Sequence, residues 1–471
     1  MIRAVMDSSE LHYLELNEVA HLIQTRKLSP VELTQAMLDR IEKLDRKLHA
    51  FALPTPEFAL EQARKAEAEI AAKRYRGALH GVPIGLKDLN YTKGIPTAAG
   101  MPIHRDFKPA FDGTVTKRLY DAGAVLVGKL QLTEGAFADH HPAITVPVNP
   151  WHPAYWSGAS SSGSGVATAA GMVFATTGSD TGGSIRFPSA ACGVTGLKPT
   201  WGRVSRYGAF ELAASLDHIG PMCRSAVDTG IVLGAIAGAD PNDPTASLLP
   251  VPDYLHDLNR DFHRIRVGLD ERYALDGVER FTVQSVRDAL GVFKSLGAEI
   301  RNVQFPAVDD VLKDWAPNCA IETAVAHEAT YPSRKSEYGP GLAGLLDLAP
   351  TLKATDYQKI LLRRRDFAGR VAALFQQIDL LVIPVQFIAS PTMKQMETLG
   401  QDAAALLSLM RFTSPFDMGG NPTITMPCGF TGAGTPIAFQ LAARPMEEDL
   451  LVSAGAAYQR ETTWHRKHPK L

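Results

Sequence analysis

The sequence predicts a layered α/β protein with a mostly parallel β-sheet, and three observations support this fold class. Segments with helical spacing alternate with short apolar segments typical of strands over most of the 471 residues. Hydrophobic residues make up 45% of the chain, which is enough for a large core. No low-complexity linker divides the sequence.

Residues 1–77 are expected to form a helical layer on the outside of the protein. Three helices are predicted there, from the helical spacing of Leu16, Val19, Ala20 and Ile23, from the sequence Ser29-Pro30-Val31-Glu32, and from the Ala, Glu and Lys residues of 56–74. The second begins with a capping box and has proline at its first position. Its apolar face consists of Leu33, Met37, Ile41 and Leu44. Gly77 is expected to stop the third helix, and the layer could contact a second copy of the chain.

Residues 78–240 are expected to carry the chemistry. Val82, Ile84 and Leu86 alternate as a strand, which places Lys87 on the opposite face with the small residues Pro83 and Gly85. A lysine at a strand end is more often a surface residue, so this position alone does not indicate function. Further elements are predicted as a helix over 114–122, a strand over 124–129 and a helix over 225–238.

A Ser- and Gly-rich stretch from Ser157 to Pro199 is the most unusual part of the sequence. The chain has no Asp, Glu, Lys or Arg from His140 to Ser179, which predicts burial of that run. Positions 158–163 lead into a helix of small residues, and Gly182-Gly183 then precede Ser184. Two adjacent glycines leave backbone N–H groups free to converge on an anion, as in an oxyanion hole. A flexible linker is the alternative, but the apolar flanks and the following Phe-Pro and Leu-Lys-Pro argue against it.

The remaining residues, 241–471, continue the alternation of helices and strands. Strands are predicted over 266–269, 298–303, 380–385, 423–427 and 437–442, and helices over 278–296, 311–329, 356–377 and from 447. The run of three arginines from Arg363 to Arg365 is expected to be a solvated helix face.

Other catalytic and cofactor motifs are absent from the sequence, and no cofactor or metal is expected. The nearest approach to a G-x-S-x-G elbow is 159–163, and the chain has neither a P-loop nor a Rossmann fingerprint. His140 and His141 have no metal-ligand spacing and are expected to be loop residues. The four cysteines show no pairing pattern, which indicates reduced thiols, and Cys192 is expected to be a small buried residue.

Charge and hydropathy indicate which partners and which compartment to expect for the protein. A net charge of −2 gives no reason to expect a nucleic-acid partner. Residues 1–16 lack the apolar region of a signal peptide, and no stretch approaches the roughly 18 apolar residues of a membrane span. We therefore expect a cytoplasmic protein that is not bound to a membrane.

Three motifs in order resemble the amidase signature family. They are L-H-G-V-P-I-G-L-K-D (79–88), G-A-S-S-S-G-S (158–164) and D-T-G-G-S-I-R-F-P-S-A-A-C-G-V-T-G-L-K-P-T (180–200), and Ser184 lies 24 positions after Ser160. The similarity extends from about Leu16 to Tyr458. One departure lies in the second motif. The family usually has P-G-G-S-S-G-G, whereas residues 157–163 of this chain read S-G-A-S-S-S-G, so Ala159 and Ser162 carry Cβ atoms where the family has glycine. These leave Ser160 and Ser184 in place but should narrow the site.

The resemblance implies a fold and a mechanism. The fold is one large domain over 1–471, a large twisted mixed β-sheet covered by helices on both faces, with the substrate pocket in 241–471. The implied triad has Ser184 as the nucleophile, Ser160 after a cis peptide bond as the proton relay, and neutral Lys87 as the base. The backbone N–H groups of four residues would stabilise the oxyanion, namely Thr181, Gly182, Gly183 and Ser184. Ser161, Asp180 and Arg186 would support the loop.

Three functions are compatible with these motifs. The first is a stand-alone amidase, similar to aryl acylamidases or urethanases, that acts as a monomer or homodimer on a small amide or carbamate. The second is the amidase subunit of a glutamine-dependent tRNA amidotransferase, whose branch the segment 202–208 resembles. The third is a catalytically silent relative, which the presence of Lys87, Ser160 and Ser184 disfavours. The sequence does not identify the preferred acyl and amine groups.

The stand-alone amidase is favoured, because this chain differs from the amidotransferase branch at the positions that resemble that branch's glutamine-binding residues. The Asp expected before the turn Thr413-Ser414-Pro415 falls on Met410, and the expected Arg falls on Gly344 or Leu345. Leu345, Leu346 and Leu348 are expected to form an apolar wall, which cannot offset the desolvation of a zwitterion. We therefore expect an uncharged, largely apolar substrate.

Overall fold

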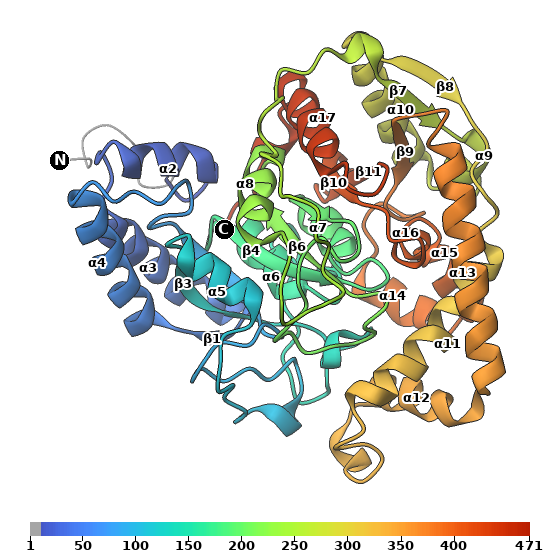
Figure 1. The fold of residues 1–471 in the computed structure, drawn as a ribbon, viewed down its shortest axis with the longest axis horizontal. Coiled ribbons are helices and arrows are strands. Elements are labelled where there is room, and N and C mark those ends of the chain that lie inside the picture. The colour runs from blue at the N-terminus through green and yellow to red at the C-terminus, as the bar shows by residue number, and fades with distance from the viewer. Residues whose placement is uncertain (1–10) are drawn as a thin grey trace.

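A computed structural model describes residues 11–471, so residues 1–10 of the segment tested for a signal peptide lie outside the described part. A single 11-stranded β-sheet runs through the centre of the protein (Figure 1). The order of its strands is β1-β3-β2-β4-β6-β5-β10-β11-β9-β7-β8. Strands from both halves of the sequence therefore meet in one sheet, where β5 lies beside β10.

The sheet is mixed, as the family resemblance implies, and not mostly parallel as the alternation of elements predicted. Parallel pairing joins β2 to β3 and β4, and β7 to β8 and β9, whereas the six other pairs are antiparallel. The strands are β1 (Phe51–Pro54), β2 (Pro83–Lys87), β3 (Val125–Leu130), β4 (Ala175–Asp180), β5 (Thr195–Lys198), β6 (His218–Cys223), β7 (Arg266–Leu269), β8 (Glu299–Asn302), β9 (Leu380–Pro384), β10 (Thr423–Phe430) and β11 (Pro436–Ala442).

Helices cover both faces of this sheet (Figure 1). One core cluster joins apolar residues of α8, α10 and α17 to the strands, and another joins α3, α4, α6 and α7 to β3. A third lies among α11, α12, α13 and α16. The α-helices are α2 (Leu16–Gln24), α3 (Pro30–Leu48), α4 (Pro56–Ala71), α5 (Thr114–Asp121), α6 (Ser162–Ala169), α7 (Arg186–Cys192), α8 (Ala226–Ile236), α9 (Glu271–Leu275), α10 (Arg280–Ser295), α11 (Asp309–Ala326), α12 (Pro340–Leu348), α13 (Ala354–Leu374), α14 (Met393–Gly400), α15 (Ala403–Met410), α16 (Ser414–Met418) and α17 (Glu448–Glu461).

The first helices form where the spacing of apolar residues predicts them. The apolar residues predicted to face inward on α2 and α3 are buried. The Ser29 hydroxyl caps α3 by accepting hydrogen bonds from the N–H groups of Val31 and Glu32. Helix α4 ends at Ala71 rather than at the predicted residue 74, because the chain turns into the left-handed region at Lys73 (φ 61°) before it reaches Gly77.

Four strands were not predicted, because their sequences lack a clear alternation of polar and apolar residues. They are β1, β4, β5 and β6, and β4 (ATTGSD) is buried along its whole length although it contains Thr, Ser and Asp. Buried central strands need not alternate, since both of their faces are covered. The short helices α7, α9, α12, α14, α15 and α16 were also not predicted.

The run without charged residues is buried only in its second part. Residues 157–180 are almost entirely buried, whereas six residues of the first part are exposed, namely Pro142, Ala143, Thr145, His152, Pro153 and Ala154. The prediction of burial was wrong for these six, because a proline-rich loop can lie at the surface without carrying charge. The arginine run also differs from expectation. Arg363 pairs with Asp314, and Arg364 donates hydrogen bonds to Ser215 and Asn318.

No helix between residues 11 and 471 combines the length and apolar character that a membrane crossing requires.

Candidate active site

Lys87 lies at the carboxyl end of β2, between the parallel strands β3 and β4. Its side chain is fully buried, and Nζ is within hydrogen-bond distance of three hydroxyl oxygens. These are Ser160 Oγ at 2.7 Å, Ser161 Oγ at 2.9 Å and Ser179 Oγ at 2.8 Å. No carboxylate of residues 11–471 contacts Nζ, so the amine is surrounded by neutral groups.

Burial of the Lys87 amine lowers its pKa to about 7, because a low-dielectric interior disfavours the ammonium form. Asp180 and Asp217 oppose the shift through their negative charges but do not cancel it. Lys87 can therefore exchange between its charged and neutral forms near pH 7, whereas an exposed lysine remains charged.

Ser160 and Ser161 lie in the turn that leads into α6. The Ala159–Ser160 peptide bond is cis. Gly158 before it has φ 86° and packs so closely that a Cβ atom there would lie 2.2 Å from Pro188 Cα. Ser161 Oγ also donates to the carbonyl of Ser179 at 3.2 Å, which ties the turn to β4.

Ser184 lies in the loop between β4 and α7 and is half-buried. Its carbonyl accepts a hydrogen bond from the Ser161 N–H at 3.3 Å, so the two serine segments are in contact. Within the described part of the chain, the Ser184 hydroxyl makes no hydrogen bond to Ser160. The structure thus joins Lys87 directly to Ser160 and places Ser184 on the adjoining loop.

Asp180 organises this loop through a single buried carboxylate. Its oxygens accept hydrogen bonds from the N–H groups of Gly183 at 2.6 Å and Ile185 at 2.9 Å, and from Nε and Nη2 of Arg186 at 3.0 and 2.8 Å. Although burial alone would raise it, the pKa of Asp180 is held well below its usual range, chiefly by the Arg186 guanidinium. Both groups therefore stay charged, as expected for residues that support the loop.

Arg186 extends the support to the C-terminal half of the chain. Its Nη1 donates to the carbonyl of Thr413 at 2.8 Å, and its Nη2 donates to Asp417 Oδ2 at 2.6 Å. Asp417 is in α16, and the carboxylates that flank Arg186 raise the pKa of its guanidinium. Lys198, whose pKa burial lowers to about 7, lies close enough to influence the same carboxylates.

The expected set of oxyanion donors needs one correction. The N–H of Gly183 already donates to Asp180, so it is not free to bind an oxyanion. The N–H groups of Thr181, Gly182 and Ser184 make no hydrogen bond within residues 11–471. Three of the four expected donors are thus free in this structure.

An apolar wall stands beside the serine loop. A Cβ atom on Gly182 would lie 2.7 Å from the Trp315 ring and 2.8 Å from Met410 Cε, so both side chains pack against this glycine. The ring of Phe137 lies parallel to that of Trp315, with 6.4 Å between centroids. Leu345 and Leu346, expected in this wall, are buried in the cluster of α11 to α13, and Gly344 is exposed.

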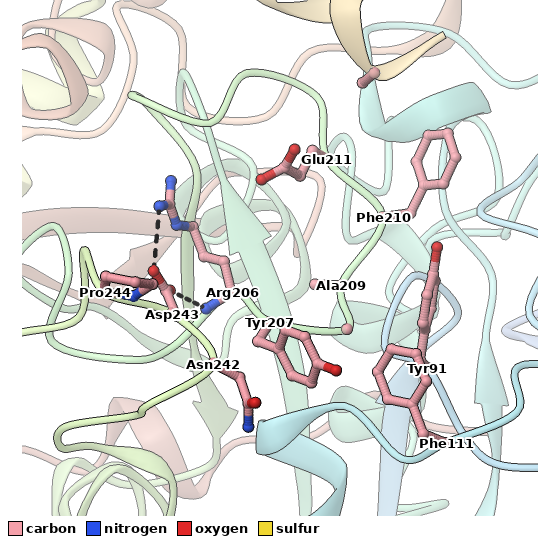
Figure 2. A pocket seen from close by; sticks show the side chains of 12 residues that line it. Tyr91, Phe111, Arg206, Tyr207, Ala209, Phe210, Glu211, Asn242, Asp243 and Pro244 are labelled. Carbon is pink, nitrogen blue, oxygen red and sulfur yellow. Dashed lines mark hydrogen bonds and ion pairs between the residues drawn. The ribbon is translucent and has the colours of Figure 1, made fainter. Parts of the chain in front are cut away.

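A separate cavity of about 370 Å³ is lined by residues that do not include Ser184. Figure 2 shows the side chains that line it. Aromatic side chains at one end include Tyr91 and Phe111, and at the other end Arg206 pairs with Asp243 (Figure 2). A narrow space of about 10 Å³, room for about one water molecule, shares Arg206 with this cavity and is also lined by Ser179 and Asp217. Ser179 also contacts Lys87 Nζ, so the narrow space borders the Lys87 environment, but neither space is lined by Lys87, Ser160 or Ser184.

His140 and His141 lie in a loop, as predicted. His140 Nε2 is 3.0 Å from Ser162 Oγ, and burial lowers the pKa of His140 to about 4. Cys192 is buried, and burial raises the pKa of its thiol. The described residues contain no group of three or more His, Cys, Asp or Glu side chains placed to hold a metal ion.

Sequence reasoning missed three residues that contact the site, namely Ser179, Trp315 and Asp417, and it placed Thr413 only in a turn near the expected substrate position. Ser179 could have been found, because it lies one residue before Asp180 and would share a strand face with Thr177 if β4 had been recognised. Trp315 and Asp417 have no local signal. They approach the loop from helices more than 130 residues away in the sequence.

Comparisons with known proteins identify the family of the chain. The model of the amidase family matches residues 32–452. A putative amidase, AmiD, of Mycobacterium tuberculosis (strain ATCC 25618 / H37Rv) is 48% identical over 467 residues, covering 99% of this chain and 98% of that protein. A glutamyl-tRNA(Gln) amidotransferase subunit of Geobacter sp. (strain M21) is 37% identical, covering 98% of this chain and 100% of that protein. The native peptide amidase of Stenotrophomonas maltophilia has a similar structure, with a TM-score of 0.83, 28% identity and coverage of 97% and 98%.

The buried Asp180–Arg186 ion pair should be important for the stability of the folded protein. Asp180→Asn leaves a buried guanidinium without its main counter-charge, so we expect the free energy of unfolding to fall by about 3–5 kcal/mol. Urea denaturation measures this. Asp121→Asn is the matched control, because Asp121 pairs with Lys117 at the surface and should contribute little. Equal midpoints for the two variants would contradict the assignment.

Proposed function

The chain belongs to the amidase signature family, which makes it an amide-hydrolysing enzyme, and we propose that it cleaves the C–N bond through an acyl-enzyme on Ser184. The observation that carries this proposal is the environment of Lys87. A fully buried amine that contacts three hydroxyl groups, with a pKa of about 7, is suited to act as a base.

The proton path follows from the hydrogen-bonding capacity of a neutral amine. Neutral Nζ has two N–H donors and one lone pair, so one of its three hydroxyl neighbours must donate to it. Ser160, at 2.7 Å, is the closest. Its hydroxyl gives its proton to Lys87 and takes the proton of Ser184 as Ser184 Oγ attacks the carbonyl carbon. This step requires the Ser184 hydroxyl to come within about 3 Å of Ser160 Oγ.

The proton then returns as the intermediate collapses. The protonated Lys87 gives a proton back to Ser160, whose own proton passes to the leaving nitrogen, and the C–N bond breaks to leave the acyl group on Ser184. The free N–H groups of Thr181, Gly182 and Ser184 are the proposed donors to the oxyanion. Water hydrolyses the ester by the same relay and restores the hydroxyl.

The first prediction concerns the nucleophile. Ser184→Ala should abolish turnover, because no other hydroxyl follows the glycine pair whose neighbouring N–H groups are free. Incubation with a fluorophosphonate followed by mass spectrometry should show one adduct, on Ser184. Ser295→Ala, which changes an exposed serine, should behave as the wild type. Labelling of Ser160 or Cys192 in place of Ser184 would contradict the assignment.

The second prediction concerns the base. The reaction needs neutral Lys87, so kcat/KM should fall as the pH drops below about 7 and the amine gains a proton. Lys87→Arg keeps the charge but cannot deprotonate, and it should lower kcat at least tenfold, or about 1.4 kcal/mol in barrier. Lys117→Arg, at the surface, is the control. A flat profile between pH 5 and 9, or an active Lys87→Arg enzyme, would exclude Lys87 as the base.

We further propose that the substrate is an uncharged, largely apolar amide or carbamate and that the enzyme works without a transferase partner. The support is the apolar character of Phe137, Trp315 and Met410 beside the serine loop. Two arginines of the run in α13 are already engaged, Arg363 by Asp314 and Arg364 by Ser215, and are not free to hold a carboxylate. The third, Arg365, is exposed. The alternative, a role within an amidotransferase, rests on the similarity to the Geobacter protein.

The third prediction distinguishes these alternatives. The kcat/KM for p-nitroacetanilide should exceed that for glutamine, because an apolar wall does not compensate for the desolvation of two charges. Release of nitroaniline and release of ammonia measure the two activities. A tenfold preference for glutamine, or activity that appears only with a partner protein, would favour the amidotransferase function.

A further inference from the structure

Four consecutive carbonyl groups, from Asp180 to Gly183, each lie within hydrogen-bond distance of a nitrogen or hydroxyl group. Asp180 O lies 3.2 Å from His218 Nδ1, and Thr181 O accepts from Trp315 Nε1 at 2.7 Å. Gly182 O accepts from Thr413 Oγ1 at 2.7 Å, and Gly183 O accepts from the Phe187 N–H at 2.7 Å. Two of these donors, Trp315 and Thr413, are side chains from the C-terminal half of the protein.

This pattern fixes the direction of the N–H groups. In a trans peptide the C=O of one residue and the N–H of the next point in opposite directions. Holding Thr181 O with Trp315 therefore sets the direction of the free Gly182 N–H. The hydrogen bond from Thr413 to Gly182 O likewise sets the direction of the Gly183 N–H, which donates to the Asp180 carboxylate at 2.6 Å. The Gly182–Gly183 peptide is thus held at both ends.

The glycines make these outside contacts necessary. Gly183 has φ 136°, a conformation that side-chain-bearing residues rarely adopt, and Gly182 has no side chain to limit its rotation. Hydrogen bonds to the carbonyls supply the restriction that the glycines lack. Oxyanion stabilisation depends on donors that are already oriented before the charge develops.

We propose that Trp315 and Thr413 are positioning residues for the oxyanion donors. Trp315 orients the free Gly182 N–H, and Thr413 fixes the Gly182–Gly183 peptide that lies between the free N–H groups of Gly182 and Ser184. Trp315 also links the substrate wall to these donors. The proposal rests on the oxyanion role assigned above to the Ser184 loop. The Trp315 indole N–H holds Thr181 O while its ring packs against Gly182 and lies parallel to Phe137. An acyl group that presses on this ring acts on the side chain that fixes the Gly182 N–H. Substrate shape then affects turnover as well as binding.

Thr413 gives the cleanest test, because its hydroxyl can be removed and restored. Thr413→Val keeps the shape and loses the donor, and it should lower kcat for p-nitroacetanilide between about 10-fold and 100-fold with KM within threefold. Thr413→Ser should recover kcat to within threefold of the wild type. The inhibition constant of an aryl trifluoromethyl ketone, which forms a tetrahedral adduct on a serine nucleophile, should rise in step with the loss of kcat.

Trp315→Phe is the second variant, because it removes the indole N–H from a different carbonyl and keeps an aromatic wall. It should show the same loss of kcat and the same weakening of the trifluoromethyl ketone, and it decides the matter if Thr413→Val does not fold. Thr462→Val is the matched control, since the Thr462 hydroxyl also donates to a backbone carbonyl, that of Tyr458, at the end of α17. Its kcat should equal that of the wild type.

The outcomes separate this inference from the proposed function. If the wild-type enzyme forms no adduct on Ser184, both fail. If the wild type is labelled and turns over, but Thr413→Val or Trp315→Phe keeps more than a third of kcat, the positioning role alone is overturned. A loss that appears entirely in KM, or a Thr413→Ser enzyme as impaired as Thr413→Val, also overturns it.

Discussion

The ion pair between Asp180 and Arg186 is the interaction on which the conformation of the serine loop depends. A buried guanidinium is tolerated only where its donors are satisfied, and Arg186 finds acceptors in Asp180, Asp417 and the Thr413 carbonyl. The same carboxylate of Asp180 receives two backbone N–H groups of the loop. The loop conformation and the contact between residues 180–186 and 413–417 are therefore parts of one network.

Burial has the opposite effect on the charge of Lys87, whose amine contacts Ser179, the residue before Asp180. Arg186 stays charged because carboxylates contact it directly, whereas Lys87 meets hydroxyl groups and its pKa falls to about 7. The difference lies in the neighbours and in the chemistry of the two cations, since a guanidinium does not lose its proton under protein conditions and an amine can. One interior thus holds a permanent charge for structure and a titratable amine that is suited to proton transfer.

Local sequence predicted those parts of the site whose signals are local. The alternation of Val82, Ile84 and Leu86 placed Lys87 at the end of a strand, and the glycine pair located the serine loop. Strand β4 was not recognised, because a central strand covered on both faces need not alternate. The occupation of the Gly183 N–H, and the approach of Trp315 and Thr413, depend on packing between distant segments, for which the motif itself carries no signal. The family resemblance corrected the expectation of a mostly parallel sheet, which the alternation of helices and strands alone favoured.

The position of β10 in the sheet has a consequence for synthesis of the chain. Strand β5 (Thr195–Lys198) pairs with β6 on one side and with β10 (Thr423–Phe430) on the other. While the ribosome is still translating the intervening residues, one edge of β5 has no partner strand, and Arg186 lacks both Thr413 and Asp417. An open sheet edge is a site for association with other chains, and pairing across such a long separation is slow. The nascent N-terminal half therefore exposes the edge of β5 that later pairs with β10, and this pairing joins the two halves of the chain that supply residues 180–186 and 413–417.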